Sequence, residues 1–77
     1  MSFELLGHIE LPGNLKPGGF DHGAVHCASS RLYVAHTAND ALDVIDCVHD
    51  CYLHSIPNLT GVAGVLVSDE QNLIFYL

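Results

Sequence analysis

The chain has 77 residues, 49% of them hydrophobic and 14% charged, with 2 Lys and Arg against 9 Asp and Glu and a formal net charge of −7 with histidine neutral. This acidic balance argues against nucleic-acid binding and against binding to anionic membranes, which both need a basic surface. The apolar content argues against intrinsic disorder, and the length allows one small domain, which buries only about 60% of the surface that its unfolded chain exposes.

Targeting signals are not evident in the sequence. No run approaches the roughly 20 apolar residues of a membrane span, and the start of the chain lacks the basic and apolar regions of a signal peptide. We therefore expect a cytoplasmic protein. The sequence has three cysteines, Cys27, Cys47 and Cys51. This small and odd number does not fit a disulfide framework and favours free thiols.

Short runs of β-branched, aromatic and other apolar residues predict strands, and no helix is expected. The first predicted strand, Leu5–Leu11, ends at Pro12-Gly13. Short connections suited to hairpins join the next four into an antiparallel meander. The four are His22–Ala28, Arg31–Thr37, Ala41–Cys47 and Cys51–Ile56. After residues 57–61 two more strands are predicted, Val62–Ser68 and Leu73–Leu77.

The pattern repeats along the chain. When the sequence is aligned with itself at a fixed offset, Gly23–His26 falls on Gly64–Val67 and Arg31–Val34 falls on Asn72–Phe75, largely apolar on apolar. A repeat of about 40 residues with four short strands is typical of a β-propeller blade. The sequence therefore predicts an all-β fold built from antiparallel four-stranded blades.

Two consecutive strands carry a family resemblance. Leu32-Tyr33-Val34-Ala35-His36, followed by Asp40-Ala41-Leu42-Asp43-Val44-Ile45-Asp46, resembles the YVTN-type, lactonase-like propeller repeat, in which a Tyr-Val-(Thr/Ala)-Asn strand precedes one ending in Val-Ile-Asp. His36 departs from the usual Asn. The resemblance covers about residues 20–77 and implies the blade architecture, but no single activity.

Strand counting predicts an incomplete propeller. Residues 3–11 would be a ring-closing strand, residues 20–57 a complete blade, and residues 61–77 the first half of the next blade. Because closed propellers have at least about four blades, we expect a fragment or truncated product. Its partners would be missing blades or other copies of itself, and an apolar edge at Leu73–Leu77 favours a homo-oligomer or aggregation.

The loops Lys16–His22 and Thr37–Asp40 are predicted to meet at the propeller mouth. Asp21, His22, His36 and Asp40 are the candidate ligand-binding residues there, while catalytic residues stay unassigned. In the repeat Asp21 and His22 fall on Val62 and Ala63, so they are not generic blade residues. The alternative is structural: Asp21 caps a turn and His22 packs at the blade entrance.

Two metal sites are considered, although no cofactor is evident. His22 and His36 are candidate ligands of a divalent metal at the mouth. Cys47, His49 and Cys51 form a second cluster on a turn, with ligand types suited to zinc or copper. The alternatives for the cysteines are small apolar residues at strand ends or a disulfide.

These observations favour a non-catalytic binding or structural module of a larger YVTN-like protein. The alternative is part of a lactonase-like or metal-assisted hydrolase with Asp21, His22 and His36 at the mouth. We expect no enzymatic activity from this chain alone.

Overall fold

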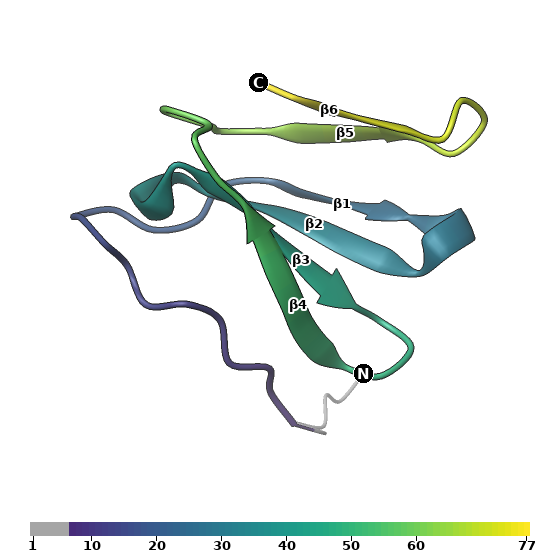
Figure 1. Cartoon of the computed structure of the whole chain (residues 1–77), viewed down its shortest axis with the longest axis horizontal. Helices are drawn as coiled ribbons and strands as arrows, with labels where there is room; N and C mark the ends of the chain where they lie inside the picture. The colour runs from purple at the N-terminus through teal and green to yellow at the C-terminus, as the bar shows by residue number, and fades with distance from the viewer. Residues whose placement is uncertain (1–6) are drawn as a thin grey trace, which may run out of the picture.

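The computed structural model describes residues 7–77, which form two antiparallel sheets (Figure 1). The first sheet contains β1 (Gly23–His26), β2 (Arg31–His36), β3 (Ala41–Asp46) and β4 (Cys51–Ile56) in chain order. The second contains β5 (Val65–Ser68) and β6 (Leu73–Tyr76). The predicted all-β class and the six strands after residue 20 are confirmed. The two sheets do not close into a ring.

Two short turns join the first three strands. They are the 3-10 turns η1 (Cys27–Ser29) and η2 (Thr37–Asn39), which the sequence did not predict. Each ends at a residue with left-handed backbone, Ser30 with φ 53° and Asp40 with φ 50°. Short polar side chains tolerate this conformation better than β-branched ones. The hairpins therefore form where the sequence places these residues.

Backbone hydrogen bonds show that the structural repeat is longer by one position than the alignment predicted from the sequence. The bond from Asp21 N–H to the Ala35 carbonyl recurs from Ala63 to Leu77. Two further backbone bonds recur in the same alignment. The bond from Ala35 N–H to the His22 carbonyl corresponds to the bond from Leu77 to Gly64. The bond from Ser30 to Cys27 corresponds to the bond from Asn72 to Asp69. We call this alignment the backbone repeat. In strands such a shift by one position moves every side chain to the opposite face.

The backbone repeat determines how the sheets face each other. We call the side of the first sheet that carries Ala24 and Tyr33 its front face and the opposite side its back face. In the backbone repeat Ala24 and Tyr33 correspond to Leu66 and Phe75, so these define the front face of the second sheet. The front face of the first sheet packs against the back face of the second, where Val65 is buried.

The apolar core lies between the two sheets. It combines front-face residues of β2 and β3 with the connection to β5 and with β5 itself, and partly buried Ala24 and Ile74 pack against it. Its buried members are Tyr33, Ala35, Leu42, Val44, Leu59, Val62 and Val65. β5 lies against β1 and, over a shorter stretch, β2. This core couples the two sheets through the connection at residues 57–64.

Residues 7–20 run along the outer side of the first sheet, away from β5 and β6 (Figure 1). Residues 7–11 are not a strand and make no backbone hydrogen bond to one among the described residues. This corrects the predicted strand over Leu5–Leu11 for its described part; the rest of that prediction lies outside the described residues. A strand needs a hydrogen-bonded neighbouring strand, and residues 7–11 have none among the described residues. Within residues 7–77 no helix has the length and apolar character needed to cross a membrane.

Candidate functional site

Three connections meet at one end of the first sheet, as the sequence predicts for Lys16–His22 and Thr37–Asp40. Ala38 donates its backbone N–H to the Gly19 carbonyl at 3.1 Å, which joins the two loops. The Thr37 hydroxyl donates to the Val62 carbonyl at 2.7 Å, which adds the connection to β5. We call this region the loop end.

Asp40 holds the loop end together. Its carboxylate accepts from the Lys16 ammonium at 2.8 Å and from the Gly61 backbone N–H at 3.0 Å, and its carbonyl accepts from the Leu59 N–H at 2.7 Å. The hydrogen bond from Lys16, followed by that from Gly61, lowers the pKa of Asp40 below its ordinary value. The geometry gives this candidate binding residue a structural role, because its oxygens already have partners from two other loops.

Asp21 and His22 form the most accessible polar pair at the loop end. The His22 ring nitrogen Nδ1 lies 2.5 Å from Asp21 Oδ1, and the His22 side chain is 83% exposed. Their backbones continue the ladder of β1 with β2 through Ala35. The corresponding residues in the backbone repeat are Ala63 and Gly64. The Asp21 and His22 side chains are therefore not part of the repeated pattern. They are accessible to solvent, while their backbone is held in place by the hydrogen bonds to Ala35.

His36 does not join them at the surface. Its side chain is fully buried, and Nδ1 lies 2.8 Å from Asp43 Oδ2, also fully buried. Its other nitrogen, Nε2, lies 2.6 Å from Asn14 Oδ1, whose amide nitrogen donates to the Gly18 carbonyl. Oxygen atoms therefore face both ring nitrogens of His36, which fixes the orientation of the imidazole.

The buried pair continues into a longer polar chain. The Ser55 hydroxyl donates to Asp43 Oδ1 at 2.7 Å, and the Tyr52 hydroxyl lies 2.7 Å from Ser55 Oγ. On a regular strand residues 52 and 55 would face opposite sides. The register between β3 and β4 shifts between Val44 and Ile45, leaving Leu53 as an extra residue, and such a bulge brings both hydroxyls to the back face.

Phe20 covers the imidazole. Its ring stacks on that of His36 with centroids 4.0 Å apart and planes inclined by 24°. Together with Asn14, it covers the His36–Asp43 pair on the outer side. We call Asn14, His36, Asp43, Ser55 and Tyr52 the buried polar network, after the buried His36–Asp43 pair at its centre. Through Asn14 this network joins residues 7–20 to the sheet.

This arrangement separates the four predicted binding residues. His36 lies inside the sheet packing, Asp40 joins loops, and Asp21 and His22 pair at the surface. Both His36 nitrogens are occupied by oxygens, so a metal on this ring would have to replace one of them. Within the described part of the chain, no group of three or more His, Cys, Asp or Glu side chains is arranged to hold a metal ion.

The second predicted cluster lies on the turn between β3 and β4. Cys47 and Cys51 are free and exposed, and His49 pairs with Asp46 at 2.8 Å. Asp46 also accepts the backbone N–H groups of Val48 and His49, which closes the turn. His49 lowers the pKa of Asp46, and the Asp46 carboxylate raises the pKa of His49. The observed contacts give His49 and Asp46 a turn-forming role.

The sequence reasoning missed two features. Asn14, Asp43 and Ser55 come from three separate segments, and the only local signal was that Asp43 lies between Leu42 and Val44, whose apolar side chains face the opposite side of the strand. A second buried imidazole, His26, lies where the two sheets meet: Nδ1 is 2.6 Å from Ser29 Oγ, whereas Nε2 is buried without a hydrogen bond. The nearest acidic oxygen to Nε2, Asp69 Oδ1, is 3.7 Å away.

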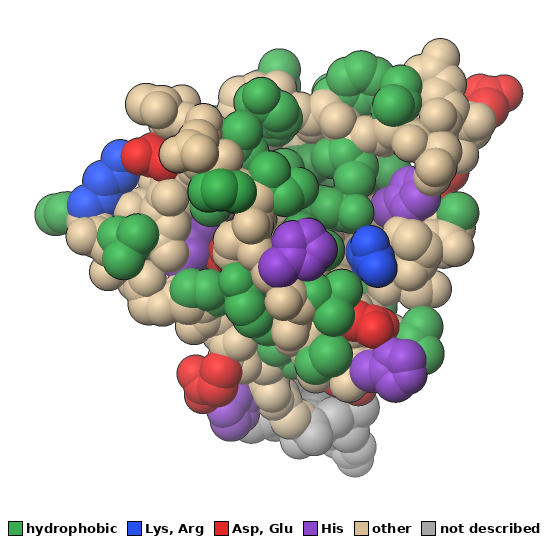
Figure 2. All heavy atoms as spheres, in the orientation of Figure 1, with side chains coloured by type: hydrophobic (Ala, Val, Ile, Leu, Met, Phe, Trp, Pro, Cys, Tyr) green, Lys and Arg blue, Asp and Glu red, His purple; other side chains and the backbone are tan. Residues whose placement is uncertain are grey.

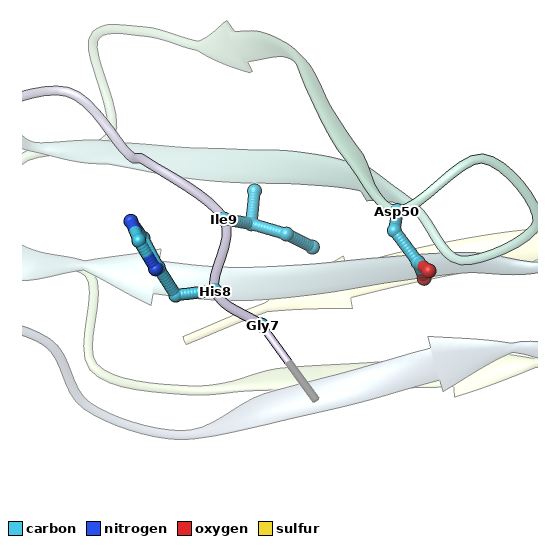
Figure 3. A pocket seen from close by; sticks show the side chains of 4 residues that line it. All are labelled: Gly7, His8, Ile9 and Asp50. Carbon is cyan, nitrogen blue, oxygen red and sulfur yellow. The ribbon is translucent and has the colours of Figure 1, made fainter. Parts of the chain in front are cut away.

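A hollow of about 530 Å³ lies between the N-terminal segment and the β3–β4 turn (Figure 3). Gly7, His8, Ile9 and Asp50 line it. Its lining contains only one imidazole, of His8, and one carboxylate, of Asp50. His8 pairs with Glu10 and not with Asp50. The loop end therefore remains the better candidate site. No protein-family model matches the chain, and no curated protein or solved structure is significantly similar to it.

Proposed function

We propose that the chain is a non-catalytic structural and binding module of a β-propeller-type, YVTN-like protein. In such a protein successive sheets stack front face to back face around an axis. The observation that carries the proposal is the recurrence of backbone hydrogen bonds, which relates the second sheet to β1 and β2. It predicts that equivalent residues point in the same direction in successive sheets.

The packing supports this interpretation. Tyr33 on the front face of the first sheet and Val65 on the back face of the second belong to one core. Two sheets facing each other as mirror-like halves of a sandwich would bring equivalent faces together instead. Front-to-back packing can continue through further sheets, since each addition leaves the same kind of face open.

The loop end is the proposed binding surface of this module. Asp21 and His22 stand outside the repeated pattern, and their side chains pair at the surface with His22 strongly exposed. Asp40, Lys16 and the connection to β5 hold the loops in place. The contacts of His36 within residues 7–77 do not favour the metal-assisted hydrolase, because both of its ring nitrogens have partners in the buried polar network and the ring would have to rearrange to act together with His22.

The test is whether the two sheets unfold as one unit. Val65 is 5% exposed within the shared core, whereas its neighbour Leu66 is 60% exposed. We expect Val65→Ala to lower the free energy of unfolding by about 2 kcal/mol and the matched variant Leu66→Ala to change it by less than about 0.5 kcal/mol. Urea unfolding followed by circular dichroism measures both.

The protein concentration in this test must be low enough for light scattering to report the mass of one chain. A single transition for the wild type, shifted by Val65→Ala, supports the stacked module. Separate transitions for the two sheets, or equal effects of the two substitutions, would contradict it.

A further inference from the structure

The front face of the second sheet has no cover among the described residues. The register pairs Leu66 with Phe75 and Ser68 with Leu73, so these four side chains share that face. Leu66 is 60% exposed, and Leu73 and Phe75 are each 48% exposed. Hydrophobic side chains are visible at the surface around this end of the molecule (Figure 2). A cluster of large apolar residues on one open sheet face is a typical interaction surface.

The internal repeat identifies what would cover this face. Leu66 and Phe75 correspond to Ala24 and Tyr33, which are covered by Val65 and Ile74 on the back face of the next sheet. In the backbone repeat Val65 and Ile74 correspond in turn to Gly23 and Leu32. The matching cover for the front face of β5 and β6 is therefore a back face with the side chains of β1 and β2.

Within residues 7–77, the back face of β1 and β2 is only partly covered. Val25 is 50% exposed and pairs in register with Leu32. A methyl group at Gly23 would lie 3.6 Å from side-chain atoms of both Leu32 and Val34, which places the three residues on one face. Phe20 and Asn14 contact the back face at His36, towards β3, instead of at Val25.

We infer that the front face of β5 and β6 in one copy binds the back face of β1 and β2 in a second copy, head to tail. The inference rests on the proposed function, since it extends the stacking seen between the two sheets of one chain. The front face of β5 and β6 cannot be covered by the back face of β1 and β2 of the same chain, because that back face lies on the far side of the first sheet. Each copy carries both surfaces, so association can proceed to a ring or to an open stack.

Charge opposes this association at low salt. Each copy has a formal net charge of −7, so two copies experience a net electrostatic repulsion. Screening by salt reduces it over a Debye length of about 8 Å at physiological ionic strength. We therefore expect the association to strengthen as the salt concentration rises.

Complementation between two variants tests the head-to-tail contact. Leu66→Glu blocks the front face and leaves the back face intact, whereas Val25→Glu does the reverse; both residues are at least half exposed. Each variant alone should be monomeric, with its dissociation constant raised at least about tenfold. An equimolar mixture should form a one-to-one dimer and stop there, while the wild type forms larger species. Light scattering after size exclusion gives the masses under reducing conditions, and native mass spectrometry identifies the pair.

Leu15→Glu is the matched control, because Leu15 is 82% exposed on the N-terminal segment, and it should associate like the wild type. Phe75→Ser repeats the front-face test with a smaller change, and circular dichroism checks that each variant keeps its strands. Three results would overturn the inference: a monomeric wild type, a Val25→Glu variant that dimerises alone, or variants that do not complement. In each case an unfolding shift in Val65→Ala would leave the proposed stacked module standing.

Discussion

The two sheets contain similar apolar strands but differ in how completely they are covered. In β3 the first five residues are buried, so both faces of this strand are packed. In β6 three of the four residues are exposed, although the strand reads Leu-Ile-Phe-Tyr. Burial therefore depends here on what covers each face of a strand, because β3 is covered on both faces and β6 on one.

The groups that cover the two faces of the first sheet also differ in chemistry. An apolar core joins the front face of the first sheet to the second sheet, while the back face of β3 is closed by the buried polar network and Phe20. A polar network has to be satisfied at every atom, so it selects one arrangement of its neighbours. An apolar face accepts any complementary apolar surface, which is why the second sheet can recruit a partner.

The largest effect is expected when the Asp43 carboxylate at the centre of the buried polar network is removed. Asp43→Ala leaves the buried His36 Nδ1 and the Ser55 hydroxyl without their acceptor, and each buried polar group left without a partner costs about 1–3 kcal/mol. A chain of this length has a free energy of unfolding of about 4–12 kcal/mol. We expect a much earlier urea midpoint by circular dichroism; an unchanged midpoint would show that the pair contributes nothing to stability.

Substitutions of His36 test what its imidazole contributes to the same network. His36→Asn introduces the residue usual in the YVTN-type repeat and keeps a group able to donate to Asp43, so it should destabilise less than His36→Ala. The same unfolding measurement ranks the two. Equal effects would indicate that ring packing against Phe20, instead of hydrogen bonding, is what His36 provides.

Hydrogen exchange compares the sheets directly. Amides of β3, paired on both sides by β2 and β4, should exchange at least about tenfold more slowly than those of β6, because exposed, singly paired strands open at lower free energy. Raising the protein concentration should slow exchange in β6 if copies cover its face, with little change in β3. Exchange in β6 that is independent of concentration would argue against the head-to-tail contact.

A smaller effect concerns the loop end. Lys16→Ala removes the hydrogen bond that contributes most to the lowered pKa of Asp40, so that pKa should rise towards its ordinary value of 3.8. A carbon-detected NMR titration of Asp40 measures the change. Since Gly61 still donates to the same carboxylate, the rise should be incomplete; no rise at all would indicate that Lys16 does not contact Asp40 in solution.

The smallest effect is expected at the β3–β4 turn. The pKa of His49 is raised above its ordinary value of 6.5 and that of Asp46 is lowered below 3.8 by their mutual contact. Their contribution to stability is therefore present between these two pKa values. It is lost as Asp46 becomes protonated at low pH and as His49 loses its proton at high pH. In an NMR titration Asp46→Asn should lower the His49 midpoint; an unchanged midpoint would contradict the pairing.

The local pattern of the sequence was sufficient to predict the six strands after residue 20 and the loops that meet at one end, but not the conformation of residues 7–11. Runs such as residues 31–36 and 41–46, separated by short polar turns, define strands because alternation and turn chemistry act over a few residues. The exact repeat length was not readable in this way, since Val25 meets an apolar residue whether it is aligned with Leu66 or with Val67. Only backbone hydrogen bonds distinguished the two alignments.

The tertiary structure decided the rest. His36 looked like a candidate ligand in the sequence, but Asn14, Asp43 and Ser55 reach it from distant segments, and a bulge at Leu53 turns Tyr52 towards the same network. Which apolar faces are covered also depends on how the sheets pack. Sequence patterns report local preferences, whereas a buried partner or a covered face depends on contacts between residues far apart in the chain.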